Sequence, residues 1–215
     1  MTTAQAVLLA TPPCLLGTCT IAFRQLAGRF GRRCGYFAGF LFYWVVWCGV
    51  VPLTLLGRSG VRAAFAWSQW PLGRPWALGA TLLLLPLVLG YTYAFPRAAR
   101  GAGLAVVIAS AALAIVNGGA EELLWRGTFL RIFPGDLVLG YLYPTLAFAL
   151  WHLAPLRVMP NRAPGGSASF VAVSGIVGAM WGWVARSSAS LVSPTVGHIL
   201  FDFAGLGGRV YVERP

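Results

Sequence analysis

The chain has few charged residues, and very few of them are acidic. Only 10% of its 215 residues are charged, with five Asp or Glu against sixteen basic residues. A soluble domain carries roughly 25% charged residues. Lysine is absent, so every basic residue is an arginine. Together with a hydrophobic content of 58% and a mean hydropathy of +0.75, this composition excludes an ordinary soluble domain and predicts an integral membrane protein.

Repeats, polar linkers and familiar metal motifs are also missing. No segment recurs with a period of about 20–50 residues, and no charged or Ser/Pro-rich linker divides the chain, so we expect a single domain over residues 1–215. The HExxH motif of zinc peptidases is absent, and the four cysteines match no CxxC spacing. The net charge of +11 does not indicate nucleic acid as a partner. The arginines lie between or beside the apolar segments, where they act as topology signals and contact lipid headgroups.

What the chain does contain is a series of apolar segments, each long enough to cross a bilayer, which takes about 20 residues. We interpret the fold as all-α, a polytopic membrane bundle of six to seven transmembrane helices. The first segment is the least regular, because Pro12 and Pro13 interrupt it. The segments lie at residues 5–23, 36–57, 77–95, 103–120, 137–156, 168–185 and 189–207.

Three of the five acidic residues lie in apolar surroundings, in the same part of the chain as the only two histidines. Placing an ionisable group at bilayer depth costs at least ~2.5–3.5 kcal/mol on insertion scales, so such groups are normally partnered, inward-facing and functional. A motif-bearing core over about residues 103–207 therefore carries one predicted polar site. Its ionisable residues are Glu121, Glu122, His152, His198 and Asp202.

The first motif places two adjacent glutamates and an arginine at the end of an apolar segment. If the helix continues through the motif, Glu122 and Arg126 stand at i, i+4 and can pair on one face. Glu121 then points about 100° away around the helix, where it is available as a general base. An ordinary ion pair at the membrane boundary accounts equally well for Glu122 and Arg126, but it does not explain Glu121.

Two further motifs place a histidine one helical turn from another side chain. Phe148 and His152 share a face within residues 137–156, where the imidazole must face protein or a water-filled cavity. A lone histidine in a helix is more often a hydrogen-bonded core residue. His198 and Asp202 are also at i, i+4. A carboxylate there can fix the imidazole tautomer, join it in binding a metal, or simply cap or pack the helix.

The ordered set of motifs resembles the CPBP family of intramembrane proteases, which includes the Rce1-like type II CAAX prenyl endopeptidases. That family carries Glu-Glu-x-x-x-Arg, then Phe-x-x-x-His, then His-x-x-x-Asn or Asp, on successive membrane helices. The chain has all three in this order, over roughly residues 116–204. The resemblance implies a glutamate-dependent endopeptidase that hydrolyses a peptide bond within or beside the bilayer.

The resemblance also implies roles for particular residues. Glu121 with His152 would activate a water, and His198 with Asp202 would stabilise the oxyanion. The eukaryotic prenyl proteases have Asn at the position of Asp202, and Asn can donate a hydrogen bond whereas ionised Asp cannot. Asp202 would therefore be protonated, orient His198 as a donor, or bind a metal. The residues with a supporting role would be Glu122, Arg126 and Phe148.

The expected partners are membrane lipids and a protein or peptide with a membrane-embedded tail, such as a C-terminal membrane-anchoring sorting segment. No cofactor is expected. One alternative is a zinc-dependent protease whose ligands would be Glu121, His152, His198 and Asp202, since these residue types all bind zinc. Another is a non-catalytic membrane binding or scaffold protein that uses the same polar cluster. The short loops and Lys-free basic set favour the inner (cytoplasmic) membrane of a high-GC bacterium.

Overall fold

The computed structural model describes residues 1–161 and 163–213, and over these residues all regular structure is helical. Each apolar segment predicted from the sequence is helical over most of its length, which confirms the all-α fold. The N-terminal half contains α1 (Thr3–Phe30), α2 (Arg32–Phe42), η1 (Tyr43–Val50), α3 (Val51–Ala64), α4 (Trp76–Leu89), η2 (Gly90–Ala94) and α5 (Phe95–Ala99), where η marks π-helical segments.

The C-terminal half carries the three motifs. Its elements are α6 (Leu104–Glu122), η3 (Leu123–Thr128), α7 (Phe129–Ile132), η4 (Val138–Leu142), α8 (Tyr143–Trp151), α9 (Leu153–Leu156), α10 (Gly166–Ser188), α11 (Val192–Ala204) and α12 (Arg209–Val212).

Within the described residues, five helices are long and apolar enough to cross a membrane. They are Thr3–Phe30, Arg32–Ala64, Trp76–Ala99, Leu104–Ile132 and Gly166–Ser188. The two histidine motifs lie on shorter helices, α8 and α11, which pack among the long ones: α8 against α1 and α10, and α11 against α4, α6 and α10. The chain is therefore a multi-pass membrane bundle in which the motif helices pack among the long ones.

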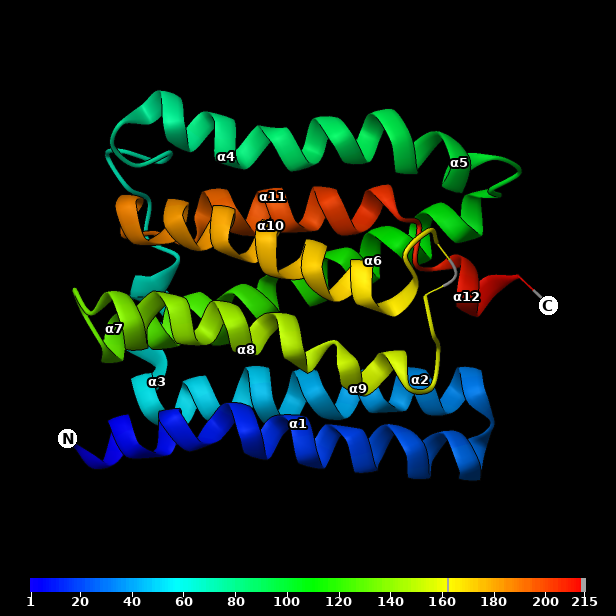
Figure 1. The fold of residues 1–215 in the computed structure, drawn as a ribbon, viewed down its shortest axis with the longest axis horizontal. Helices are drawn as coiled ribbons and strands as arrows, with labels where there is room; N and C mark the ends of the chain where they lie inside the picture. The colour runs from blue at the N-terminus through cyan, green and yellow to red at the C-terminus, as the bar shows by residue number, and fades with distance from the viewer. Residues whose placement is uncertain (162, 214–215) are drawn as a thin grey trace.

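The long helices run roughly parallel to one axis of the molecule (Figure 1). In this view α1 and α2 lie along one side and α4 along the opposite side, with α6, α8, α10 and α11 between them. The N-terminus lies at the end of the bundle that carries α3 and α7, and α5 and α12 both lie at the other end.

The first helix continues through both of its prolines, so the interruption expected there does not occur. Proline removes a backbone donor and frees the carbonyl four residues earlier, which for Pro13 is the carbonyl of Leu9. The hydroxyl of Tyr143 donates to this Leu9 oxygen at 2.7 Å. A neighbouring helix thus satisfies the carbonyl, as transmembrane helices with internal prolines require.

Candidate active site

The helix that carries the first motif continues past both glutamates, as predicted. α6 ends at Glu122 and leads directly into η3, so Arg126 lies on the same helical rod. Glu121 and Glu122 are only 1% and 0% exposed. Since they are neighbours on one helix, their carboxylates point in different directions and meet different partners.

Glu122 belongs to a buried ionic group. Its Oε1 accepts a hydrogen bond from Arg126 Nη1 at 2.9 Å, which confirms the predicted pair, and lies 2.9 Å from His198 Nδ1. Arg126 also donates from Nη2 to the carbonyl of Gly178 at 3.2 Å. The guanidinium carbon lies 4.3 Å from the centre of the Phe148 ring. Glu122 and Arg126 thereby tie α6 and η3 to α8, α10 and α11.

Two glycines allow this close packing. A Cβ atom at Gly178 would lie 2.8 Å from the Phe148 ring and 3.0 Å from Arg126 Nη2. A Cβ atom at Gly118 would lie 2.9 Å from the side chain of Ile199 and 3.0 Å from its backbone nitrogen. Small residues let membrane helices approach closely. Here the approach of α6 to α11 brings the first motif next to the third.

One carboxylate oxygen of Glu121 is held by aromatic side chains in the core, and the other faces Asn117 and His198. Its Oε1 accepts hydrogen bonds from Tyr43 Oη at 3.0 Å and Trp151 Nε1 at 3.1 Å. Its Oε2 accepts from Asn117 Nδ2 at 3.2 Å and lies 3.4 Å from His198 Nε2. The carboxylate of Glu121 is therefore fixed in orientation, with Oε2 beside the imidazole of His198.

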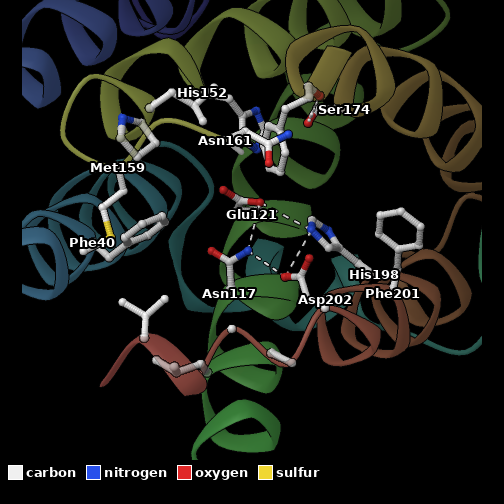
Figure 2. A pocket seen from close by; sticks show the side chains of 18 of the residues that line it. Phe40, Asn117, Glu121, His152, Met159, Asn161, Ser174, His198, Phe201 and Asp202 are labelled. Carbon is white, nitrogen blue, oxygen red and sulfur yellow. Dashed lines mark hydrogen bonds and ion pairs between the residues drawn. The ribbon is translucent and has the colours of Figure 1, made fainter. Parts of the chain in front are cut away.

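Asp202 completes the cluster from one turn further along α11. Its Oδ2 lies 3.6 Å from His198 Nε2 and accepts a hydrogen bond from Asn117 Nδ2 at 2.8 Å. The side chain of Asp202 is 28% exposed, whereas that of His198 is 5% exposed. Figure 2 shows Glu121, Asn117, His198 and Asp202 connected in one network at the wall of a pocket. The structure thus brings together the first and third motifs.

His152 lines the same pocket from the end of α8, and Figure 2 shows it on the side away from Asp202. Its Nδ1 lies 2.8 Å from the carbonyl oxygen of Phe148, and the two rings meet edge to face at 4.9 Å. Because a carbonyl oxygen only accepts, Nδ1 carries the proton. Nε2 therefore holds the lone pair of the neutral ring and is the nitrogen able to accept a hydrogen bond.

The sequence reasoning missed several partners of Glu121. Asn117 had a usable signal, since it is an amide in an apolar segment, one helical turn before Glu121. Tyr43 and Trp151 had no such signal, because aromatic residues make up 13% of the chain and nothing in the sequence sets these two apart. The rings of these two residues stack at 3.7 Å, and Trp125 Nε1 donates to Tyr43 Oη at 2.8 Å. This aromatic group packs behind Glu121 and holds its Oε1.

The pocket has a volume of about 550 Å³, within the range of roughly 300–1,000 Å³ typical of ligand sites. It extends from Glu121 and Asp202 to α12 and the segment after α9. Among the described residues that line it, none is an arginine. Its apolar and aromatic wall includes Phe40, Trp44, Met159, Phe170, Val210 and Tyr211.

A zinc site at these residues would need several ligands converging on one ion. Within residues 1–161 and 163–213, no group of three or more His, Cys, Asp and Glu residues is arranged to hold a metal ion. The oxygens nearest to His198 Nε2 belong to Glu121 and Asp202, and both accept hydrogen bonds from Asn117. The site is thus arranged as a hydrogen-bonded network, and the predicted zinc ligands, His152 included, do not fit a metal centre as they lie.

These features define a class: a multi-pass helical membrane protein with a buried, fixed carboxylate that faces an apolar pocket. Residues 103–204 match the model of the family described as Rce1-like, type II CAAX prenyl endopeptidase, and this part of the chain belongs to that family. The match contains all three motifs and confirms the resemblance seen in the sequence. No curated protein and no solved structure is a significant match to the chain. The family indicates a membrane-embedded protease that acts on proteins or peptides.

Proposed function

We propose that the protein is an intramembrane endopeptidase that hydrolyses a peptide bond in the membrane-embedded tail of a protein substrate, using water activated by Glu121. The observation that carries this proposal is the asymmetry of the Glu121 carboxylate. Its Oε1 is held by Tyr43 and Trp151, and its Oε2 is the oxygen next to His198. A fixed carboxylate beside a pocket has the geometry that a general base requires.

In the proposed reaction, a water between Glu121 and His152 attacks the carbonyl carbon of the scissile bond. The proton of the water passes to Glu121 Oε2, while Nε2 of His152 accepts the second hydrogen bond of the water and orients it. The carbon–nitrogen bond then breaks, and Glu121 returns the proton to the departing amine. The second proton of the water stays on the new carboxyl group until it passes to the amine, so the products are a carboxylate and an ammonium group.

His198 is the proposed donor to the oxyanion of the tetrahedral intermediate. The carboxylate oxygen of Glu122 that faces Nδ1 already accepts from Arg126, so Nδ1 carries a proton and donates. Nε2 is left for the substrate, and a proton on Nε2 supplies the donor that stabilises developing negative charge. Asp202 Oδ2 lies 3.6 Å from the same Nε2, so it orients the imidazole before the substrate binds and gives up the Nε2–H donor to the oxyanion. Asp202 itself then need not donate.

The pocket supports a neutral, apolar substrate segment. Its wall is apolar and aromatic, and the charged groups that line it are Glu121, Asp202 and the histidines. An acidic substrate residue would meet these carboxylates, and the described lining residues include no arginine to neutralise it. A membrane-anchoring tail satisfies this requirement, and we place the reaction in a bacterial inner membrane, where such tails are removed during protein sorting.

The test is cleavage of a library of tail-anchored peptides by detergent-purified wild type, Glu121→Gln and Glu213→Gln, followed by mass spectrometry. Glu121→Gln keeps the shape of the side chain and removes the base. Glu213→Gln makes the same change on a carboxylate that is 41% exposed. We expect the wild type and Glu213→Gln to cleave the same peptides at similar rates, and folded Glu121→Gln to give no product.

Other outcomes favour the alternatives. Activity lost with a chelator and recovered with Zn²⁺ would indicate a metalloprotease. Retained function of Glu121→Gln, or binding of peptides by a folded wild type without cleavage, would favour a binding or scaffold protein.

A further inference from the structure

Asn117 is the one described amide that contacts both carboxylates nearest to His198. Its Nδ2 donates to Glu121 Oε2 at 3.2 Å and to Asp202 Oδ2 at 2.8 Å. It therefore joins the end of α6 to α11 through hydrogen bonds rather than through an ion pair. The motif that attracts attention in the sequence begins one turn later, so Asn117 lies outside it.

The orientation of the amide is fixed by a third contact. Trp44 Nε1 lies 2.8 Å from Asn117 Oδ1. An indole N–H can only donate, so the atom facing it must be the amide oxygen, and the NH₂ group must face the carboxylates. Both protons of the NH₂ group are thus used, one on each acid.

This arrangement solves an electrostatic problem of the site. Glu121 Oε2 and Asp202 Oδ2 both lie within 3.4–3.6 Å of His198 Nε2, and like charges held so close in a buried site disfavour each other. A neutral group with two donors and no competing charge satisfies both oxygens and keeps them beside the imidazole. An Asp at position 117 would instead add a third carboxylate.

We propose that Asn117, with Trp44 behind it, is a positioning residue that couples Asp202 to Glu121 and sets the distance of both from His198. Asn117 donates to Oε2 of Glu121, the proposed base, and does not itself contact the substrate. The expected effect on kcat rests on the proposed peptidase function. The expected effect on stability rests on the hydrogen-bond geometry alone.

The test exchanges the residue types at positions 117 and 202. Asn117→Asp places a carboxylate opposite a carboxylate, and Asp202→Asn places an amide opposite an amide. The double variant Asn117→Asp with Asp202→Asn restores one amide and one acid. On a peptide that the wild type cleaves, we expect each single change to lower kcat about 100-fold, the loss typical of a small misplacement of catalytic groups, with KM unchanged. In the double variant the carboxylate introduced at position 117 still faces Glu121. We therefore expect it to recover only the part of the loss that comes from the contact between positions 117 and 202, and to be less impaired than the two single losses combined, as strongly coupled neighbours are.

Trp44→Phe provides a second variant with little risk to folding, because it keeps an aromatic ring and removes only the N–H. Without that donor the amide of Asn117 is free to turn over, and we expect kcat to fall about tenfold, within the range of one lost hydrogen bond. Folded Asn117→Asp or Trp44→Phe with wild-type kcat would overturn the inference. So would a double variant as impaired as the two single losses combined.

Melting temperatures of the same proteins in detergent test the coupling without any substrate. We expect both single variants to melt earlier than the wild type, and the double variant to recover part of the loss, so that it melts higher than the two single losses combined would give. If the wild type cleaves no peptide but the double variant recovers in melting temperature, the proposed function is overturned and the positioning role of Asn117 is supported. Cleavage by the wild type without recovery in kcat or melting temperature would overturn the role of Asn117 alone.

Discussion

At the scale of single residues, the charge balance of the site rests on Arg126. Its side chain is 3% exposed and faces Glu122, which is fully buried. Removing one partner of a buried ion pair costs about 3–5 kcal/mol, because the other charge stays buried. We therefore expect Arg126→Met to lower the melting temperature in detergent strongly, and addition of Glu122→Gln to recover part of the loss.

Arg131→Met is the matched control, since Arg131 is exposed on α7. An exposed substitution of this kind changes stability by about 0.5 kcal/mol or less. Equal losses for Arg126→Met and Arg131→Met would contradict the account of the buried pair.

The residues of the motifs could be predicted because ionisable groups are rare in this chain and costly in apolar surroundings. The i, i+4 spacing then gave the pairing of Glu122 with Arg126 and the separate direction of Glu121. The contacts of Glu121 with Tyr43 and Trp151 could not be predicted. They depend on how η1 and α8 pack against α6. Nothing in the sequence distinguishes these two aromatic residues from the many others.

At the scale of elements, the approach of α6 to α11 depends on Gly118. Gly118→Ala would place a methyl group 3.0 Å from the backbone nitrogen of Ile199, so the two helices must separate. We expect a lower melting temperature, and a fall in peptide cleavage as His198 moves away from Glu121. Gly119→Ala is the control, because a Cβ atom there meets nothing within 4 Å. If Gly119→Ala proved as harmful as Gly118→Ala, loss of glycine flexibility rather than helix contact would be responsible.

The length of each apolar segment was enough to predict that it forms a helix. Whether that helix is unbroken, and how long it is, could not be predicted. The prolines of α1 argued for an interruption, but the hydroxyl of Tyr143 satisfies the carbonyl of Leu9. That contact is tertiary, between residues distant in the sequence. Likewise, α8 and α11 pack among longer helices, and hydropathy alone does not reveal which apolar segments do so.

At the scale of the whole molecule, the arginines are unevenly divided between the two ends of the bundle. The end with α5, α12 and the α1–α2 connection (Figure 1) carries Arg29, Arg32, Arg33, Arg97, Arg100, Arg157 and Arg209. The end with α3 and α7 carries Arg58, Arg62, Arg74, Arg131 and Arg186. Arginine-rich ends face the cytoplasm. We therefore expect α12, and the side of the pocket that it lines, to face the cytoplasm.

Reporter fusions in a bacterial host measure this orientation. A green fluorescent protein fused after α12 should fluoresce, and alkaline phosphatase at the same point should be inactive. Fusions after Ser188, at the end of α10, should behave in the opposite way. The reverse pattern at both points would show that the pocket faces outward.

Cleavage in ¹⁸O-labelled water tests most directly whether Glu121 activates water for peptide hydrolysis. The assay compares wild type, Glu121→Gln and Glu213→Gln on one peptide, with mass spectrometry of the products. We expect wild type and Glu213→Gln to place ¹⁸O in the new carboxylate, and folded Glu121→Gln to give no product. Labelled product from Glu121→Gln at the wild-type rate, or unlabelled product from the wild type, would contradict this role of Glu121.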